Sequence, residues 1–154
     1  MYGRAFWFAR VPEGSPLSIH AAMSTSAPLQ RGDLVPHFTV RSVNGDTVRY
    51  AAIWQSEQLV LIVLPDVRSS VVEQYVGSLA AHEDEFSAHE SRCVVTRDGV
   101  PGLVAPAALV ADRWGEIAHV TYAADVAGLP AARELLDWIQ YVQHKCPECE
   151  GEAH

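Results

Sequence analysis

The longest clean apolar run of the sequence is the six-residue stretch Leu-Val-Leu-Ile-Val-Leu, Leu59–Leu64. It has the length of a strand, and its lack of polar alternation is typical of a strand covered on both faces. Pro65-Asp66 ends the run, and Ser69-Ser70 then offers hydroxyl groups that can cap a helix. The stretch therefore predicts a central strand that leads through a short loop into a helix.

Outward from this strand, the sequence alternates between strand and helix patterns. The turn signal Asn44-Gly45 separates Pro36–Val40 from Thr47–Tyr50, which predicts a hairpin before the central strand. Apolar spacing predicts the later elements: a helix over Val71–His89, strands over Arg92–Thr96, Ala107–Ala111 and Ile117–Tyr122, and a final helix over Ala131–His144. This order predicts an α/β or α+β sandwich with a central mixed sheet.

The composition indicates one globular domain. The chain has 154 residues, and its 49% of apolar residues suffices for a core and excludes global disorder. Its net charge of −8 disfavours nucleic acid as a partner. No apolar run approaches the roughly 20 residues of a membrane-spanning helix, so no membrane span is expected. Three cysteines are too few for a disulfide framework, and the cytoplasm is the predicted compartment.

The two ends of the chain differ from its middle. The first ten residues hold four aromatic and two basic side chains: Tyr2, Phe6, Trp7, Phe8, Arg4 and Arg10. Their apolar stretch, Ala5–Ala9, is shorter than the core of a secretory signal. Met23 offers an alternative start, which would make residues 1–22 an extension that packs poorly. We expect a flexible extension over 1–27, a domain over 28–145, and a cysteine-containing tail over 146–154.

Two segments carry a resemblance to a known family. The segment Gly32–Phe38 (GDLVPHF), followed by the hairpin Asn44–Val48, resembles the opening of AhpC/TSA-type peroxiredoxins and related redoxins. The segment Pro106–Ile117 (PAALVADRWGEI) resembles the family's P-A-T-F-V-I-D-x-x-G-x-I hairpin. The resemblance spans roughly residues 30–143. It implies a thioredoxin-like three-layer sandwich of the peroxiredoxin type, with helices flanking the sheet and a cis proline, Pro106, beside the active site.

The family's peroxide-reducing motif is only partly present. Peroxiredoxins attack peroxide with the cysteine of P-x-x-x-T/S-x-x-C. Here Pro65 and Ser69 keep their places, whereas Val72 stands at the cysteine position. Valine cannot form the reactive thiolate, and the arginine that assists it in the family is missing near Pro106. These departures imply a degenerate site and a non-catalytic relative of the antioxidant enzymes. Such a relative would serve binding or assembly, with an unidentified protein or a second copy as partner.

Three side chains after the central strand, Arg68, Ser69 and Ser70, are of types that can take part in chemistry. Ser69 and Ser70 are the only nucleophile-like groups there, but a serine nucleophile needs an adjacent base and a group that orients it. Helix capping is therefore the expected role of these serines. Arg68 can bind an anion together with free N–H groups of the helix start, or it is a solvated loop side chain.

The tail carries a C-x-x-C motif with three open interpretations. Cys146 and Cys149 can bind one Zn²⁺ with His144 and His154 as further ligands, and a dimer could complete the site. Alternatively, the pair acts as a thiol–disulfide oxidoreductase, although a position after a helix end disfavours a thiolate. In the third interpretation the tail is inert, and no cofactor besides zinc is expected. Cys93 lies in a predicted strand and is interpreted as a buried apolar residue.

Overall fold

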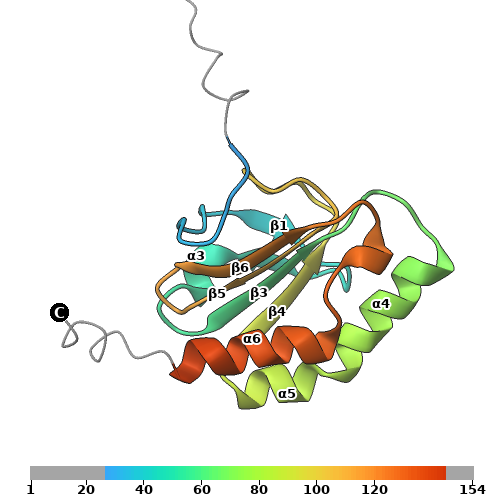
Figure 1. Cartoon of the computed structure of the whole chain (residues 1–154). Coiled ribbons are helices and arrows are strands. Elements are labelled where there is room, and N and C mark those ends of the chain that lie inside the picture. The colour runs from blue at the N-terminus through green and yellow to red at the C-terminus, as the bar shows by residue number, and fades with distance from the viewer. Residues whose placement is uncertain (1–26, 145–154) are drawn as a thin grey trace, which may run out of the picture.

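A four-stranded mixed sheet forms the centre of the computed structural model, which describes residues 27–144 (Figure 1). The strand order is β4-β3-β5-β6, with β3 parallel to β4 and antiparallel to β5. The strands are β3 (Gln58–Val63), β4 (Ser91–Thr96), β5 (Ala107–Ala111) and β6 (Ile117–Tyr122). The predicted N-terminal extension, up to Ser26, and the cysteine-containing tail lie outside the described residues.

The apolar run Leu59–Leu64 occupies the middle of this sheet, as predicted. All six of its side chains are at most 2% exposed. Val60 and Ile62 point to the same core as the helices α4 (Ser70–Ala81), α5 (Glu83–Ala88) and α6 (Ala132–His144). Leu59 and Leu61 point to the opposite core. Continuous hydrophobicity therefore reflects burial on both faces.

The opposite face is covered by the N-terminal hairpin and a short helix. Strands β1 (Thr39–Arg41) and β2 (Thr47–Arg49) pair antiparallel, and α3 (Tyr50–Ile53) follows directly. Figure 1 shows α4, α5 and α6 on one side of the sheet and β1 and α3 on the other. The predicted α/β sandwich, with a mixed sheet between flanking layers, is confirmed.

Two predicted elements were wrong in extent. The hairpin strands are shorter than Pro36–Val40 and Thr47–Tyr50, because Tyr50 begins α3 and stacks on Phe38 at 5.4 Å. The predicted helix over Val71–His89 is interrupted at His82, which ends α4 and precedes α5. Three acidic residues follow this break, and acidic side chains stabilise a helix start through its dipole.

The last two connections complete the domain. The turn between β5 and β6 contains Gly115 at a φ of 91°, a conformation that glycine adopts without strain. A 3-10 helix, Val126–Gly128, then leads from β6 to α6. Within residues 27–144, no helix is long and apolar enough to cross a membrane.

Candidate functional site

The degenerate motif lies where β3 leads into α4. Ser69 has an extended backbone, and its Oγ accepts a hydrogen bond from the Val72 N–H at 3.3 Å. Its carbonyl oxygen accepts a second bond from the Glu73 N–H at 3.0 Å. Ser69 is therefore the N-cap of α4, which satisfies donors that a helix start otherwise leaves unpaired.

Val72 is part of the hydrophobic core at this helix start. Its side chain is 3% exposed and belongs to the cluster between the sheet and the helices α4–α6. The neighbouring Val71 points outward and is 49% exposed. The Val72 position is thus filled by an apolar side chain that packs against the helix-side core.

The peptide bond between Ala105 and Pro106 is cis, as the sequence resemblance implied. The register that pairs Val63 with Ala107 places Pro106 at the same end of the sheet as Pro65. Pro106 is buried, and its carbonyl accepts a hydrogen bond from the Ala123 N–H at 3.0 Å. The structure therefore brings the motif residues and the cis proline to one end of the sheet.

Among residues 27–144, one ion pair lies at this end of the sheet, and a second arginine there is not paired. Arg97 follows β4 and lies 3.9 Å from a carboxylate oxygen of Glu73 in the first turn of α4. The Arg97 Nε atom is buried and has no hydrogen-bond partner among the described residues. Arg68 is exposed and forms no ion pair with a carboxylate of residues 27–144. The solvated interpretation of Arg68 agrees with this exposure.

No general base accompanies the serines of this segment in the described structure. The hydrogen bonds of the described histidine rings go elsewhere: His82 to Ser78, His89 to Gln143, His119 to Thr121 and His144 to Gln140. The fifth described histidine, His37, lies near the rings of Tyr50 and Trp54. Without a base, the serine hydroxyls have no means of activation, which agrees with the capping role.

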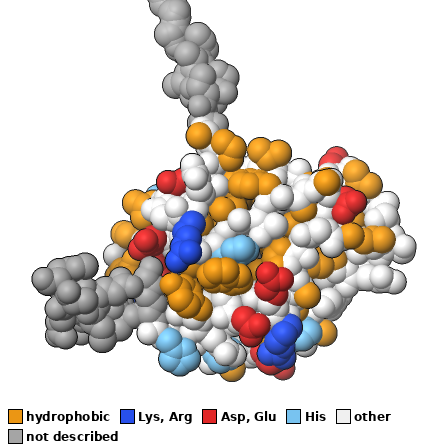
Figure 2. Space-filling view, in the orientation of Figure 1, with side chains coloured by type: hydrophobic (Ala, Val, Ile, Leu, Met, Phe, Trp, Pro, Cys, Tyr) orange, Lys and Arg blue, Asp and Glu red, His pale blue; other side chains and the backbone are white. Residues whose placement is uncertain are grey.

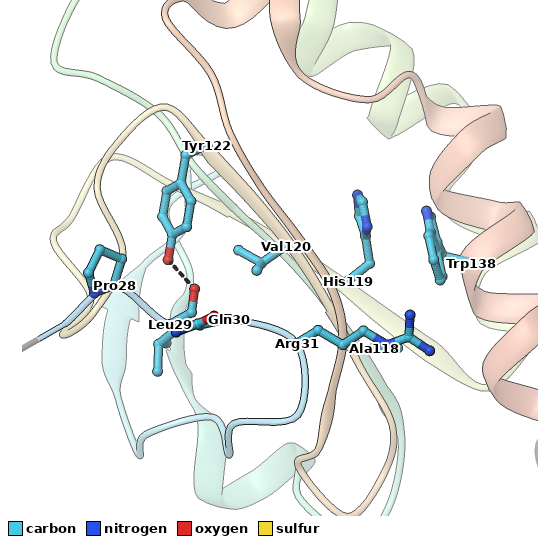
Figure 3. A pocket seen from close by; sticks show the side chains of 9 residues that line it. All are labelled: Pro28, Leu29, Gln30, Arg31, Ala118, His119, Val120, Tyr122 and Trp138. Carbon is cyan, nitrogen blue, oxygen red and sulfur yellow. Dashed lines mark hydrogen bonds between the residues drawn. The ribbon is translucent and has the colours of Figure 1, made fainter.

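A groove that sequence reasoning missed lies beside the edge strand β6. It comprises a cavity of about 430 Å³ and a neighbouring one of about 450 Å³, which share Arg31 and Trp138. We call it the β6–α6 groove; its lining residues are Pro28–Arg31, Ala118–Val120, Tyr122, Glu134, Asp137, Trp138 and Tyr141. Figure 3 shows the first described segment arching away from β6 on one side, with Trp138 on the other.

Aromatic contacts hold the α6 side of the groove in place. The His119 and Trp138 rings stack at 4.4 Å with an angle of 14° between their planes, and Tyr141 meets Trp138 edge-on at 5.6 Å. Burial lowers the pKa of His119 and so favours the uncharged form of its ring. Arg31 donates a hydrogen bond to the Tyr141 hydroxyl at 3.4 Å. In Figure 2, apolar side chains surround a histidine on this face, with acidic and basic side chains beside them.

The other side of the groove is formed by Pro28–Arg31, which hydrogen bonds hold against β6. Between this segment and α6, the outer edge of β6 is open. The Tyr122 hydroxyl donates to the Leu29 carbonyl at 2.7 Å. Backbone bonds join Gly32 and Asp33 to Ile117 at 2.9 Å each. From His119 to Tyr122, no backbone hydrogen bond from the described residues reaches the outer edge of β6. The groove therefore combines apolar side chains with unpaired main-chain groups.

Comparison with solved structures identifies the fold. The reduced 2-Cys peroxiredoxin of Plasmodium vivax matches with a TM-score of 0.62 at 14% identity, over 76% of this chain and 83% of that one. AhpC of Mycobacterium tuberculosis matches with a TM-score of 0.58 at 13% identity, over 79% and 98%. A yeast mitochondrial 1-Cys peroxiredoxin matches with a TM-score of 0.60 at 14% identity, over 75% and 76%.

The chain has a peroxiredoxin-like thioredoxin fold. No protein-family model matches the sequence, and no curated protein matches it either. At these identities the likeness is one of fold, and a fold alone does not determine an activity. The chemistry of the peroxiredoxin-like domain must therefore be judged from its own side chains.

Cys93 is the one cysteine that the structure describes, and it is a poor nucleophile. Burial, with a smaller contribution from the Glu83 carboxylate, raises the pKa of the Cys93 thiol to about 12. The side chain packs against the helix-side core, but it is partly buried and not fully buried as its position in a strand predicted. A thiol with this pKa is almost fully protonated at neutral pH, whereas the thiolate is the nucleophile.

Metal ligands are not grouped within the described part of the peroxiredoxin-like chain. Residues 27–144 contain no cluster of three His, Cys, Asp or Glu side chains that could hold an ion. His144 is the last residue of α6, and its Nδ1 lies 2.8 Å from the Gln140 carbonyl. The other predicted ligands, Cys146, Cys149 and His154, lie outside the described residues, so the zinc and disulfide hypotheses for the tail stay predictions.

Proposed function

We propose that this peroxiredoxin-like chain is not a thiol peroxidase and acts as a binding protein. The observation that carries the proposal is Val72, a buried apolar side chain at the position where the motif of the family has its cysteine. Peroxide reduction needs a thiolate that attacks the O–O bond, and valine has no atom that can take this role. Neither Ser69 nor Cys93 replaces it, since one caps α4 and the other has a raised pKa.

Binding is proposed at the β6–α6 groove, with a protein segment as the partner. An edge strand with unpaired N–H and C=O groups can accept another strand, and the neighbouring apolar residues supply contact area. Trp138 and Tyr141 are residues of the type that dominates protein interfaces. The partner is a second protein or a second copy of the chain.

A peroxide assay tests the catalytic half of the proposal. The full chain is mixed with hydrogen peroxide and dithiothreitol, and peroxide loss is followed against dithiothreitol alone. We expect equal rates, because Val72 cannot form a thiolate and the raised pKa of Cys93 keeps nearly all of that thiol protonated at neutral pH. Turnover above background would refute the proposal. If Cys146→Ser abolished that turnover, the C-x-x-C pair would be the active group and the chain a thiol–disulfide oxidoreductase.

Matched tryptophan substitutions test the binding half. Trp138 lines the groove, whereas Trp114 is 51% exposed at the tip of the β5–β6 turn. Once a partner is captured by cross-linking, its yield should fall at least tenfold with Trp138→Ala and stay unchanged with Trp114→Ala. Equal yields from both variants would place the binding surface elsewhere. Circular dichroism of both variants excludes unfolding as the cause.

A further inference from the structure

The β6–α6 groove lies next to the point where the described chain begins. Its wall is formed by Pro28–Arg31, and the 26 residues before Ala27 are covalently joined to this wall. Any apolar segment among them is held close to the groove at a high effective concentration, because the linker turns binding into an intramolecular event. The preceding sequence is therefore the first candidate for an occupant.

Two carboxylates at the rim of the groove form no ion pair with the described residues. Glu134 and Asp137 line the cavity around Trp138 and Tyr141. Neither carboxylate is among the ion pairs of residues 27–144. Arg31 shares this rim, which leaves two acidic groups against one basic group. An occupant with apolar side chains and a net positive charge matches this surface.

The sequence before Pro28 contains such a segment. Tyr2–Arg10 holds four of the thirteen aromatic residues of the chain together with Arg4 and Arg10, and it has no acidic residue. We propose that Tyr2–Arg10 binds the β6–α6 groove of its own chain, with its aromatic side chains on the apolar lining and its arginines toward Glu134 and Asp137.

Chain length permits this contact. Arg10 and Pro28 are separated by 18 residue steps. A coil of that length has an end-to-end distance of about 25 Å, so the segment reaches a neighbouring groove without stretching. Aromatic residues also favour extended backbone, which suits pairing with the open edge from His119 to Tyr122.

The inference goes beyond the proposed function and does not depend on it. The groove can be covered by its own chain whether or not a second protein binds there. If both hold, Tyr2–Arg10 competes with the partner for the same groove. The peroxide assay does not test binding of Tyr2–Arg10 to the groove. The proposal on peroxidase activity and the proposal on this segment can therefore fail independently.

Hydrogen exchange of the full chain tests the contact. The variant Phe6→Ser/Trp7→Ser/Phe8→Ser is compared with the unsubstituted chain by mass spectrometry. Amides of β6 between His119 and Tyr122 that point away from β5 should exchange at least tenfold faster in the variant, and those of the other edge strand, β4, should not change. The control Leu17→Ser/Ile19→Ser removes apolar residues outside the proposed segment and should leave β6 unchanged.

Each alternative occupant gives a different result. Equal β6 exchange in the unsubstituted chain and the triple variant overturns the proposal and leaves the groove open or covered by other residues. Protection that grows with protein concentration overturns the same-chain contact and indicates the segment of a second copy. Faster exchange in the Leu17/Ile19 control as well would indicate a general effect of the extension and would also overturn it.

A peptide experiment gives a second, independent readout. A synthetic peptide of residues 1–12 is titrated into the triple variant, whose own segment no longer competes. Binding should weaken at least tenfold with Glu134→Lys/Asp137→Lys added, and stay unchanged with Asp66→Lys/Asp84→Lys, two exposed acids away from the groove. Absence of binding, or equal weakening by both pairs, contradicts the proposal.

Discussion

The folded domain should protect Cys93 from alkylation by about three orders of magnitude. Burial and Glu83 raise the pKa of the thiol from 9.0 to about 12. Each pKa unit is a factor of ten in the thiolate fraction, so the fraction at pH 8 falls roughly a thousandfold on folding. Labelling with iodoacetamide, followed by digestion and mass spectrometry, gives the rate for Cys93 in buffer and in guanidinium.

The pH dependence of this rate separates ionisation from access. In the folded chain the Cys93 rate should rise about tenfold per pH unit from pH 8 toward 11, whereas in guanidinium it should level off near pH 9. A folded rate within tenfold of the denatured one at pH 8 would refute the burial argument. It would also return Cys93 to the set of candidate nucleophiles. The same raised pKa leaves stability unchanged below pH 9, where the thiol is protonated in both states, and it lowers stability progressively as pH rises from 9 toward 12.

Three further predictions follow from the helix start and the tail. Val72→Ala should reduce the free energy of unfolding by about 2 kcal/mol, because two buried methyl groups are lost. The control Val71→Ala, at the exposed neighbouring residue, should change the free energy of unfolding by less than about 0.5 kcal/mol in the same urea titration. Ser69→Ala should cost about 1 kcal/mol by loss of the N-cap, whereas Ser70→Ala should have little effect; equal losses would contradict the capping assignment. Native and denaturing mass spectrometry should show whether Cys146 and Cys149 bind zinc or form a disulfide. Bound zinc adds mass only in the native spectrum, whereas a disulfide lowers the mass by two hydrogens and is reversed by a reductant. An unchanged mass in both spectra would contradict both hypotheses.

The sequence predicted those elements whose signals are local. Leu59–Leu64 is fully buried because a continuous apolar run can be satisfied only between two layers. Asn44-Gly45 marks the hairpin because glycine takes the φ of 100° that the turn requires. Ser69 was identified as a cap because its hydroxyl acts on an amide three residues away.

The missed features depend on contacts between distant segments. The Thr47–Tyr50 pattern favours a strand throughout, yet Tyr50 starts α3 because its ring stacks on Phe38 and its N–H bonds to the Phe38 carbonyl. The β6–α6 groove joins residues as far apart as Arg31 and Tyr141, whose hydrogen bond spans 110 positions. No local sequence pattern predicts a contact between residues so far apart in the chain, so the groove could be found only from the structure.

Two places in this fold, the start of α4 and the outer edge of β6, differ in which groups they leave accessible. At the start of α4, a buried valine strengthens the core where a reactive group would need solvent and a polar environment. At β6, by contrast, the fold itself creates the opening, because an edge strand has no neighbour on one side and α6 must cross it to cover the core. Val72 does not line the β6–α6 groove, although it shares the helix-side core with the groove residues Ala118 and Trp138. The binding function proposed for this groove therefore requires no thiol at position 72.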